Sequence, residues 1–325
     1  MSRACCIGMV WLLGVLGNIA LPDMAQAVVI PLTEAKVVST VDQTPQPIRY
    51  YAPGQTATTV PLLVSLHSWS GDYHQDHSKY VDEAGTRGWA FVEPNFRGKN
   101  DHPEACGSAI ARQDILDAID WMIQNHRVNP KQVYVVGESG GGMMTLLMAG
   151  YHPERFAAAS AWVPISDLAE WERFHFKNGQ PDNYAKQTVQ CCGGRPGASE
   201  AVDAEYKQRS ALTVLHRVGA LPLDINAGVT DGKTGSVPFQ HSLRAFNVVA
   251  KAHGTAEIPE GEMDELWKDG RLAKPEPQDE AEDATYGRKI FLRRTSNAAR
   301  VTIFDGGHEG LPKAACAWLA KQPAR

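Results

Sequence analysis

The feature that most constrains the fold is an apolar strand-like run, followed by a glycine-rich turn and an apolar helix-like segment. Residues 133–136 read Val-Tyr-Val-Val, residues 137–141 read Gly-Glu-Ser-Gly-Gly, and residues 143–149 are apolar apart from one threonine. Small residues on both sides of Ser139 let the strand and the helix approach closely, and the sharp turn lifts the serine hydroxyl out of the sheet. The run therefore predicts an α/β fold in which Ser139 is the nucleophile at the end of a buried strand.

Short apolar runs alternate with longer amphipathic ones along the rest of the chain. In a helix over residues 114–121, Ile115, Ala118 and Ile119 share one face and acidic residues lie opposite. This alternation is typical of a mostly parallel sheet that carries helices on both faces. The sequence predicts strands at residues 61–66, 89–94, 133–136, 157–162, 221–227 and 301–304.

The N-terminal segment has the composition of a secretory signal peptide. Arg3 is followed by an uncharged apolar run over residues 7–21 and then by Ala25-Gln26-Ala27, a small-x-small site of the kind that signal peptidase cleaves. A membrane span needs roughly 20 apolar residues, and this run is shorter. We therefore expect cleavage after Ala27 and export of the mature chain to the periplasm or the medium.

The remaining residues, 28–325, suit a single domain. The chain is 43% hydrophobic and 21% charged, which is ordinary for a globular protein. Two polar stretches, residues 166–197 and 254–286, interrupt the alternation and are predicted to be insertions over the strand ends; the second also fits a solvated surface loop. The net charge of -5 and the absence of a basic stripe argue against nucleic acid as a partner. The sequence does not define the oligomeric state.

A serine nucleophile needs a histidine base and a carboxylate that orients it, in the chain order serine, acid, histidine for this architecture. His308 follows the predicted strand 301–304 and precedes an apolar C-terminal helix around residues 315–319, so its loop should overhang Ser139. Eleven histidines are present, and none of the others has this position. His308 is therefore the predicted base.

The predicted acid is Asp231, which lies just past the carboxyl end of the strand 221–227. Asp224, inside that strand, is the alternative. The same loop loosely matches a phosphate-binding motif over residues 227–234, but Gly235 and Pro238 interrupt the helix that such a motif requires. We therefore predict no nucleotide site, and no organic cofactor.

The oxyanion that forms during acyl transfer needs two backbone amides. One is predicted to be the N–H of Gly140, and the other lies in the loop after the strand 61–66, where Trp69 is our assignment and Ser68 the alternative. Loops at strand ends also carry specificity. The aromatic residues Tyr73, Trp171 and Phe174 are candidates for a substrate pocket, with simple packing as the alternative.

Four cysteines follow the signal segment: Cys106, Cys191, Cys192 and Cys316. In an exported protein some of them are expected to be oxidised, and a bridge from Cys106 to Cys191 or Cys192 is predicted; four buried thiols remain the alternative. The run His-Gln-Asp-His at residues 74–77 has no further ligands at recognisable spacing, so we predict no metal site.

Together these segments resemble the catalytic domain of the prolyl oligopeptidase group of α/β-hydrolases, including its single-domain esterase relatives. The resemblance covers most of residues 28–325 and carries the nucleophile, the acid and the base onto Ser139, Asp231 and His308. Two departures are present: His67-Ser68 stands where the family has His-Gly, and the loop 232–236 is longer than usual. The matching pieces are residues 66–69, 94–98, 114–121, 137–141, 228–231, 237–238 and 306–308.

The resemblance also implies a class of reaction. Peptidases of this group carry a large N-terminal β-propeller, whereas here only residues 28–60 separate the signal from the oxyanion-loop strand. We therefore expect a serine esterase that resembles acetyl xylan and feruloyl esterases and acts on a carbohydrate or aryl ester. A serine peptidase of the prolyl oligopeptidase type is the same-fold alternative, and a non-catalytic module that binds a glycan or a partner is the alternative of another class.

Overall fold

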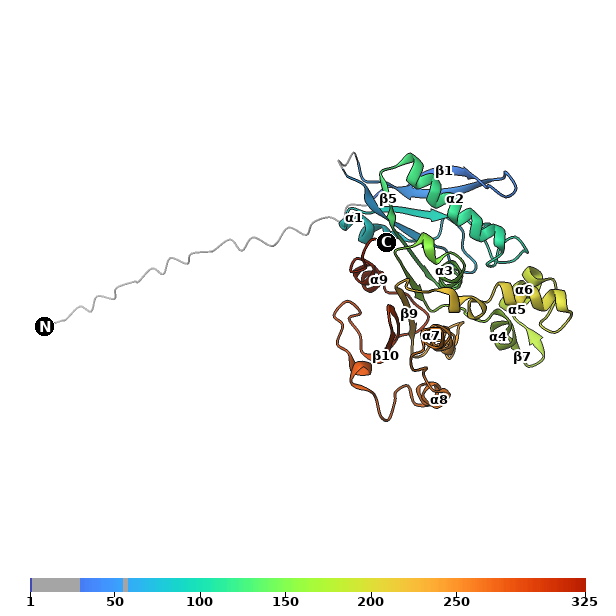
Figure 1. The fold of residues 1–325 in the computed structure, drawn as a ribbon. Helices are drawn as coiled ribbons and strands as arrows, with labels where there is room; N and C mark the ends of the chain where they lie inside the picture. The colour runs from blue at the N-terminus through green and yellow to red at the C-terminus, as the bar shows by residue number, and fades with distance from the viewer. Residues whose placement is uncertain (2–29, 55–57) are drawn as a thin grey trace.

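A nine-stranded sheet forms the centre of the protein (Figure 1) in the computed structural model, which describes residue 1, residues 30–54 and residues 58–325. The segment predicted to be a signal peptide lies outside the described residues, apart from Met1. The strands follow the order β1-β2-β4-β3-β5-β6-β9-β11-β10. Their bounds are β1 Thr33–Val38, β2 Pro45–Tyr51, β3 Val60–Leu66, β4 Ala90–Pro94, β5 Val128–Glu138, β6 Ala158–Trp162, β9 Leu223–Gly228, β10 Ile290–Ser296 and β11 Ala299–Phe304.

The middle of the sheet is parallel and its edges are antiparallel. β3 pairs in parallel with β4 and β5, and β5, β6, β9 and β11 continue the parallel order. β1, β2 and β10 add antiparallel edges. All six predicted strands are present. Because parallel strands end at the same edge of the sheet, the loops after β3, β5, β9 and β11 meet there.

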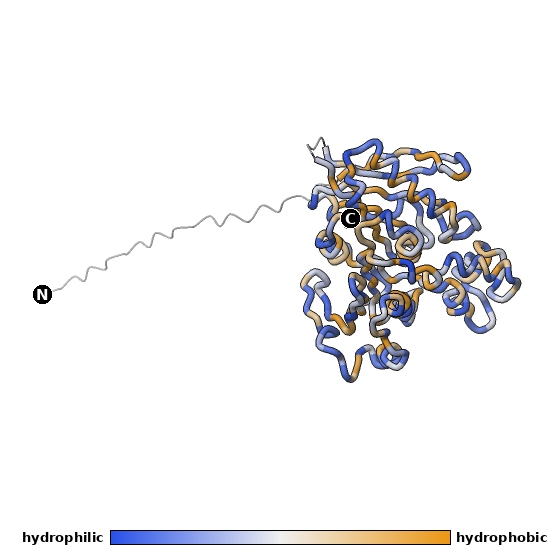
Figure 2. The backbone as a smooth tube through the Cα atoms, in the orientation of Figure 1, coloured by the Kyte–Doolittle hydropathy of each residue, from blue (hydrophilic) through white to orange (hydrophobic). Residues whose placement is uncertain are grey.

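Two layers of helices bury the two faces of the sheet. Val133 and Val135 of β5 join a core cluster with residues of α2, α3 and α7, whereas Tyr134 and Val136 join a second cluster with α1 and α9. This alternation explains why the strand reads as a continuous apolar run. Figure 2 shows the apolar segments gathered along the central strands. The bounds are α1 Ser78–Thr86, α2 Ala109–Asn125, α3 Gly140–Tyr151, α7 Gln240–Ala252 and α9 Pro312–Leu319.

The first predicted insertion, residues 166–197, contains two helices and a short hairpin that lie to one side of the sheet (Figure 1). Asp167 and Asp182 begin the helices, because each carboxylate accepts two backbone N–H groups of the first turn. The elements are α4 Leu168–Phe174, β7 Phe176–Lys177, β8 Gln180–Pro181 and α5 Asn183–Cys192, after which α6 Glu200–Gln208 follows.

The second predicted insertion, residues 254–286, contains α8 Glu260–Asp269 and the short helix η4 Pro277–Glu280. Three further 3-10 turns complete the fold: η1 Pro153–Arg155, η2 Ala211–Thr213 and η3 Leu215–Arg217. In the part of the chain that the structure describes, no helix is long and apolar enough to span a membrane.

Candidate active site

Ser139 occupies a strained turn between β5 and α3. Its φ is 58° and its ψ is -117°, a conformation that a residue with a Cβ adopts only when its surroundings hold it there. Its N–H donates to the carbonyl oxygen of Trp162 at 2.9 Å, and its own carbonyl oxygen accepts from the N–H of Met143 at 2.8 Å. These two bonds fix the serine at the carboxyl end of β5.

The glycines around Ser139 are required by close backbone approach. A Cβ on Gly137 would collide with the backbone of Gly141, and a Cβ on Gly141 would collide with the carbonyl oxygen of Leu66. A Cβ on Gly140 would lie 2.5 Å from the nitrogen of Trp69. The turn can therefore touch β3 and the loop after it only because these three positions lack side chains.

Replacing Gly141 with alanine is expected to destabilise the fold. Alanine gains about 1 kcal/mol over glycine in a helix, but the clash with backbone atoms cannot be relieved by a rotamer change, and overpacking of this kind costs roughly 1–3 kcal/mol or more. The free energy of unfolding in urea measures the effect. Gly261→Ala in α8 is the matched control, because a Cβ there has nothing within 4 Å; equal stability of the two variants would contradict the prediction.

His308 and Asp231 meet on the loops after β11 and β9. His308 Nδ1 lies 2.8 Å from Asp231 Oδ2. Asp231 is fully buried, and its Oδ1 accepts the N–H groups of Gly232 at 2.9 Å and Val237 at 3.3 Å. The carboxylate therefore holds the Nδ1–H tautomer of His308, which leaves a lone pair on Nε2, as a general base requires.

The alternative acid, Asp224, lies elsewhere. It is fully buried inside β9, where it accepts from Arg300 Nε at 2.6 Å and from the Ser160 hydroxyl at 2.8 Å. These contacts link three neighbouring strands, and neither of them involves His308. The geometry thus brings Asp231, and not Asp224, to the predicted base.

His308 Nε2 has a partner that the sequence did not indicate. It lies 3.2 Å from the hydroxyl oxygen of Ser236, and no hydrogen bond joins Nε2 to Ser139 Oγ in the described part of the chain. Catalytic hydrogen bonds in free enzymes are often long and shorten when substrate binds. The structure thus places the predicted nucleophile and base at the same edge of the sheet, with Ser236 beside the base.

The loop after β3, predicted to supply an oxyanion donor, brings a backbone amide close to the turn that carries Ser139. The N–H of Ser68 donates to Gln75 Oε1 at 2.7 Å, so it is already used. The carbonyl oxygen of Trp69 accepts from the backbone N–H and the side chain of Asn100, at 2.9 and 3.1 Å, which fixes the loop. In the described part of the chain, the N–H of Trp69 donates to no other group, and its nitrogen would lie 2.5 Å from a Cβ on Gly140. The geometry therefore favours Trp69 over Ser68 as the donor that accompanies Gly140.

A buried polar relay holds Gln75 in place. Gln75 Nε2 lies 3.0 Å from His77 Nε2, and His77 Nδ1 lies 2.9 Å from Glu93 Oε2. Arg49 closes the relay with an ion pair to Glu93 Oε1 at 2.5 Å. Gln75 and His77, which belong to the run 74–77 predicted to be a polar loop without a metal, thus support the loop that carries Trp69. Among the residues that the structure describes, no group of three or more His, Cys, Asp or Glu side chains is arranged to hold a metal ion.

His67 is a second support of the same loop. Burial lowers the pKa of its imidazole to about 4, although the carbonyl oxygens of Ser68 and Asn95, at 2.9 and 2.8 Å, favour protonation. The ring stacks on Phe96 with a centroid separation of 3.8 Å. His67 therefore fixes the loop through both ring nitrogens and through packing.

Trp171, a candidate for the substrate pocket, is buried in the protein. Its ring is 1% exposed, packs against Trp69 at 4.5 Å, and donates from Nε1 to the carbonyl oxygen of Ser236 at 2.8 Å. A ring this buried offers little surface to a ligand, so the packing alternative holds for Trp171. Tyr73 and Phe174 are half-buried, and their role in substrate binding stays a prediction.

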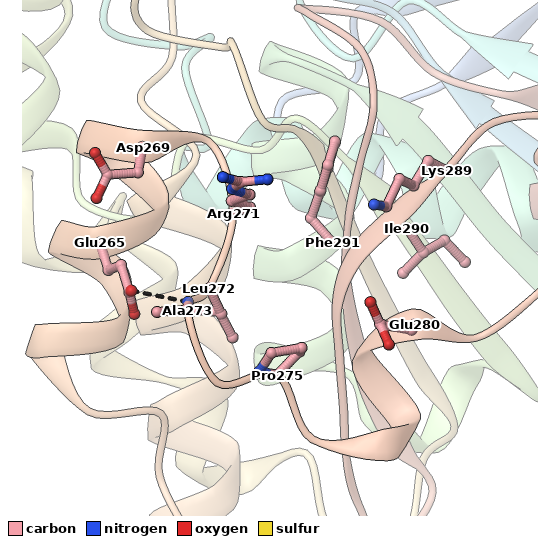
Figure 3. Close-up of a pocket in the computed structure, with 10 residues that line it drawn as sticks. All are labelled: Glu265, Asp269, Arg271, Leu272, Ala273, Pro275, Glu280, Lys289, Ile290 and Phe291. Carbon is pink, nitrogen blue, oxygen red and sulfur yellow. Dashed lines mark hydrogen bonds between the residues drawn. The ribbon is translucent and has the colours of Figure 1, made fainter.

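A pocket of about 320 Å³ opens beside the base. His308 and Glu138, the neighbour of Ser139, form part of its wall. Tyr80 donates to Glu138 Oε1 at 3.0 Å across the pocket. A larger groove of about 680 Å³ lies between α8 and β10 (Figure 3), with Arg271 on one side and Lys289 on the other. None of Ser139, Asp231 and His308 lines that groove, whereas His308 lines the smaller pocket. The smaller pocket is therefore the candidate substrate site, although neither Ser139 nor Asp231 is part of its wall.

The four cysteines are buried free thiols in the structure. Cys106 and Cys191 are close enough to interact, and burial together with this neighbour raises the pKa of the Cys106 thiol well above its usual range. Burial also raises the pKa of Cys192 to about 12. The disulfide stays a prediction, and the contact favours Cys191 over Cys192 as the partner of Cys106.

If that disulfide forms, Cys106→Ala is expected to lower the free energy of unfolding of the oxidised protein by about 2–5 kcal/mol. A non-reduced digest examined by mass spectrometry should contain the peptides of Cys106 and Cys191 joined together. Cys316→Ala is the control, because Cys316 belongs to the core cluster on the other face of the sheet. The bridge would be contradicted if Cys106 and Cys191 were alkylated without prior reduction, and if both variants lost the same free energy of unfolding.

The fold and the site define an α/β-hydrolase: a mostly parallel sheet, a serine on a strained strand-to-helix turn, and an Asp–His pair after the later strands. The sequence model of the prolyl oligopeptidase family matches residues 78–258. The chain belongs to this family.

Individual relatives match parts of the chain. Acetylxylan esterase A of Aspergillus ficuum is 26% identical over 125 residues, which cover 36% of this chain and 41% of that protein. Feruloyl esterase B of Neurospora crassa is 29% identical over 128 residues, with coverages of 36% and 43%. The structure of an acylaminoacyl peptidase from Pyrococcus horikoshii superposes with a TM-score of 0.56 at 19% identity, over 69% of this chain and 35% of that one. The chain thus spans less than half the length of these proteins.

Proposed function

We propose that this protein is an exported serine hydrolase that cleaves carboxylic esters through an acyl-enzyme on Ser139. The observation that carries the proposal is the 2.8 Å bond between His308 Nδ1 and the buried Asp231, at the sheet edge where the strained Ser139 turn ends β5. A buried carboxylate that fixes a histidine tautomer near a strained serine is the arrangement that activates a hydroxyl nucleophile.

In the proposed reaction, His308 Nε2 takes the proton of Ser139 as its Oγ attacks the ester carbonyl. The N–H groups of Trp69 and Gly140 donate to the resulting oxyanion, and losing one such donor typically costs on the order of 100- to 1000-fold in rate. The ester C–O bond then breaks, the alcohol leaves with the proton from Nε2, and water releases the acid by the same steps in reverse order.

The substrate class that we propose is a carbohydrate or aryl ester. Two relatives are named as acetylxylan and feruloyl esterases, and the pocket of about 320 Å³ beside His308 has room for a small acyl or alcohol group. The family name and the acylaminoacyl peptidase fold support a serine peptidase as the second candidate.

A fluorophosphonate and a substrate pair test the proposal. The purified protein should be labelled stoichiometrically at Ser139, as mapped by mass spectrometry, and should hydrolyse 4-nitrophenyl acetate much faster than the nitroanilides of proline or alanine. Comparable rates on esters and nitroanilides would favour the peptidase. A folded protein that the fluorophosphonate never labels would favour a non-catalytic binding module.

The proposed export is tested separately. The N-terminal run of residues 1–27 supports it. Expression of the full sequence in a secreting bacterium should yield a mature protein whose N-terminus is Val28, outside the cytoplasm; recovery of uncleaved protein from the cytoplasm would contradict export.

A further inference from the structure

Ser236 lies on the loop between β9 and α7, the loop that also carries Asp231. Its hydroxyl oxygen lies 3.2 Å from His308 Nε2. Because Nδ1 donates to Asp231, Nε2 carries a lone pair, and the hydroxyl of Ser236 must be the donor. In the free enzyme, the hydroxyl of Ser236 therefore donates a hydrogen bond to Nε2, the atom that would receive the proton of Ser139.

The position of Ser236 is fixed from the first insertion. Its carbonyl oxygen accepts from Trp171 Nε1 and from His175 Nε2, each at 2.8 Å. His175 is held in turn by Asp182, whose Oδ2 lies 2.6 Å from Nδ1. The preceding residue, Gly235, fits tightly, because a Cβ there would lie 2.6 Å from the Cβ of His308. A backbone held by two donors and by this close approach keeps its hydroxyl beside Nε2.

The same insertion also holds the other half of the site. Trp69 of the oxyanion loop donates from Nε1 to Gln187 of α5 at 2.8 Å, and its ring packs against Trp171 of α4. One structural unit thus sets both the amide that faces the oxyanion and the hydroxyl that faces the base. Such a unit is suited to place groups around a reacting ester with the accuracy that catalysis requires.

We propose that Ser236 binds the leaving-group oxygen of the ester, an inference that rests on the proposed esterase function. When Nε2 has taken the proton of Ser139, it can no longer accept, and the hydroxyl of Ser236 needs a new acceptor. The protonated Nε2 must then come within about 3 Å of the departing oxygen. An oxygen in that place is also within reach of a hydroxyl that lies 3.2 Å from the same nitrogen.

The proton balance of the step is simple. The proton moves from Ser139 Oγ to Nε2, and from Nε2 to the departing oxygen as the ester C–O bond breaks; the acyl group remains on Ser139, and the alcohol leaves. Ser236 donates a hydrogen bond to the departing oxygen and transfers no proton. This hydrogen bond speeds the departure of a basic alcohol most, such as a sugar hydroxyl, because the oxygen of such an alcohol carries the most negative charge as the C–O bond breaks. Ser236 therefore favours the cleavage of esters of aliphatic alcohols.

A series of acetate esters tests this role, since they share one acyl-enzyme and differ in the alcohol. We would measure kcat/KM, which reports acylation, for the acetates of 4-nitrophenol, phenol, trifluoroethanol and ethanol, per site titrated by the fluorophosphonate. Ser236→Ala should lose about 5- to 10-fold on ethyl acetate, as expected for one hydrogen bond, and less than about 2-fold on 4-nitrophenyl acetate. Ser236→Thr, which keeps the hydroxyl, should restore most of the loss.

The control is Thr234→Ala, which removes another hydroxyl from the same loop; that hydroxyl bonds the carbonyl oxygen of Thr230 at 3.3 Å and not His308. It should leave all four rates unchanged. Equal losses of Ser236→Ala on every ester would mean that Ser236 only holds the loop, and no loss on ethyl acetate would remove it from the reaction; either result overturns the inference. Failure of the proposed function is distinct, because the unsubstituted protein would then not be titrated by the fluorophosphonate.

Discussion

Replacing Ser139 with alanine is expected to lower kcat for ester hydrolysis by about 10⁵- to 10⁶-fold, since the members of a serine–histidine pair act as one unit. The variant loses the acyl-enzyme route entirely. What remains is direct attack by water at a carbonyl polarised by the amides of Trp69 and Gly140, which in comparable enzymes still exceeds the uncatalysed rate by roughly 10³- to 10⁴-fold. Labelling by a fluorophosphonate should be lost completely.

The change is measured with 4-nitrophenyl acetate on enzyme purified free of endogenous esterases. Ser242→Ala is a matched control, because Ser242 is buried and its hydroxyl has no hydrogen-bond partner among the described residues. That variant should retain normal turnover. Turnover by Ser139→Ala within about tenfold of the unsubstituted protein would rule out the acyl-enzyme, because one nucleophilic group supplies far more than that.

The strand, turn and helix around Ser139 were predictable because their signals are local. A glycine is needed where two backbones touch, and an apolar run is needed where both faces of a strand are buried. Both requirements are visible within residues 133–149. The helices and parallel strands that surround the turn followed from the same kind of local pattern. The chain order of nucleophile, acid and base then added Asp231 and His308, which stand 77 residues apart and whose side chains the structure brings together.

The edge strands escaped prediction for a physical reason. β1 and β2 consist mostly of exposed and partly buried residues, with one buried residue each. β2 contains Pro45 and Pro47, which are tolerated because they precede the part of β2 that pairs with β4. β10 carries Arg293 and Arg294 on successive positions. None of these strands has the continuous apolar run of a central parallel strand, so a search for such runs finds only the middle of the sheet.

The supporting contacts of the site escaped prediction because they join segments that are distant in sequence. Gln75 binds the N–H of Ser68 and is itself positioned by His77, which Glu93 holds. Trp171 reaches Ser236 across 65 residues. The sequence did contain one hint, the unusual length of the loop 232–236. It gave no indication that the extra residues would place a hydroxyl on the base, because that depends on where the first insertion packs.

Replacing Asp231 with asparagine is expected to lower kcat by about 10⁴-fold while the fold is largely retained, and the reason is the set of donors around the carboxylate. Oδ1 faces the backbone N–H groups of Gly232 and Val237, which an amide nitrogen cannot satisfy. The asparagine carbonyl must therefore stay at that position, and its NH₂ group must face His308 Nδ1.

With an NH₂ donor opposite, Nδ1 must become the acceptor, and the proton of the neutral ring then moves to Nε2. A protonated Nε2 cannot accept the proton of Ser139, so the substitution removes the base without removing the histidine; loss of this size is known for the wrong tautomer. Asp305→Asn is the matched control, because Asp305 is exposed on the same loop as His308 and should leave kcat unchanged. If Asp231→Asn and Asp305→Asn had equal turnover, the carboxylate that orients the base would have to be sought elsewhere. The expected result is a loss of kcat in Asp231→Asn alone, with unfolding free energies of the two variants within about 1 kcal/mol of each other. The loss of kcat would then be assigned to the tautomer of His308, because unfolding could explain it only if the two unfolding free energies differed far more.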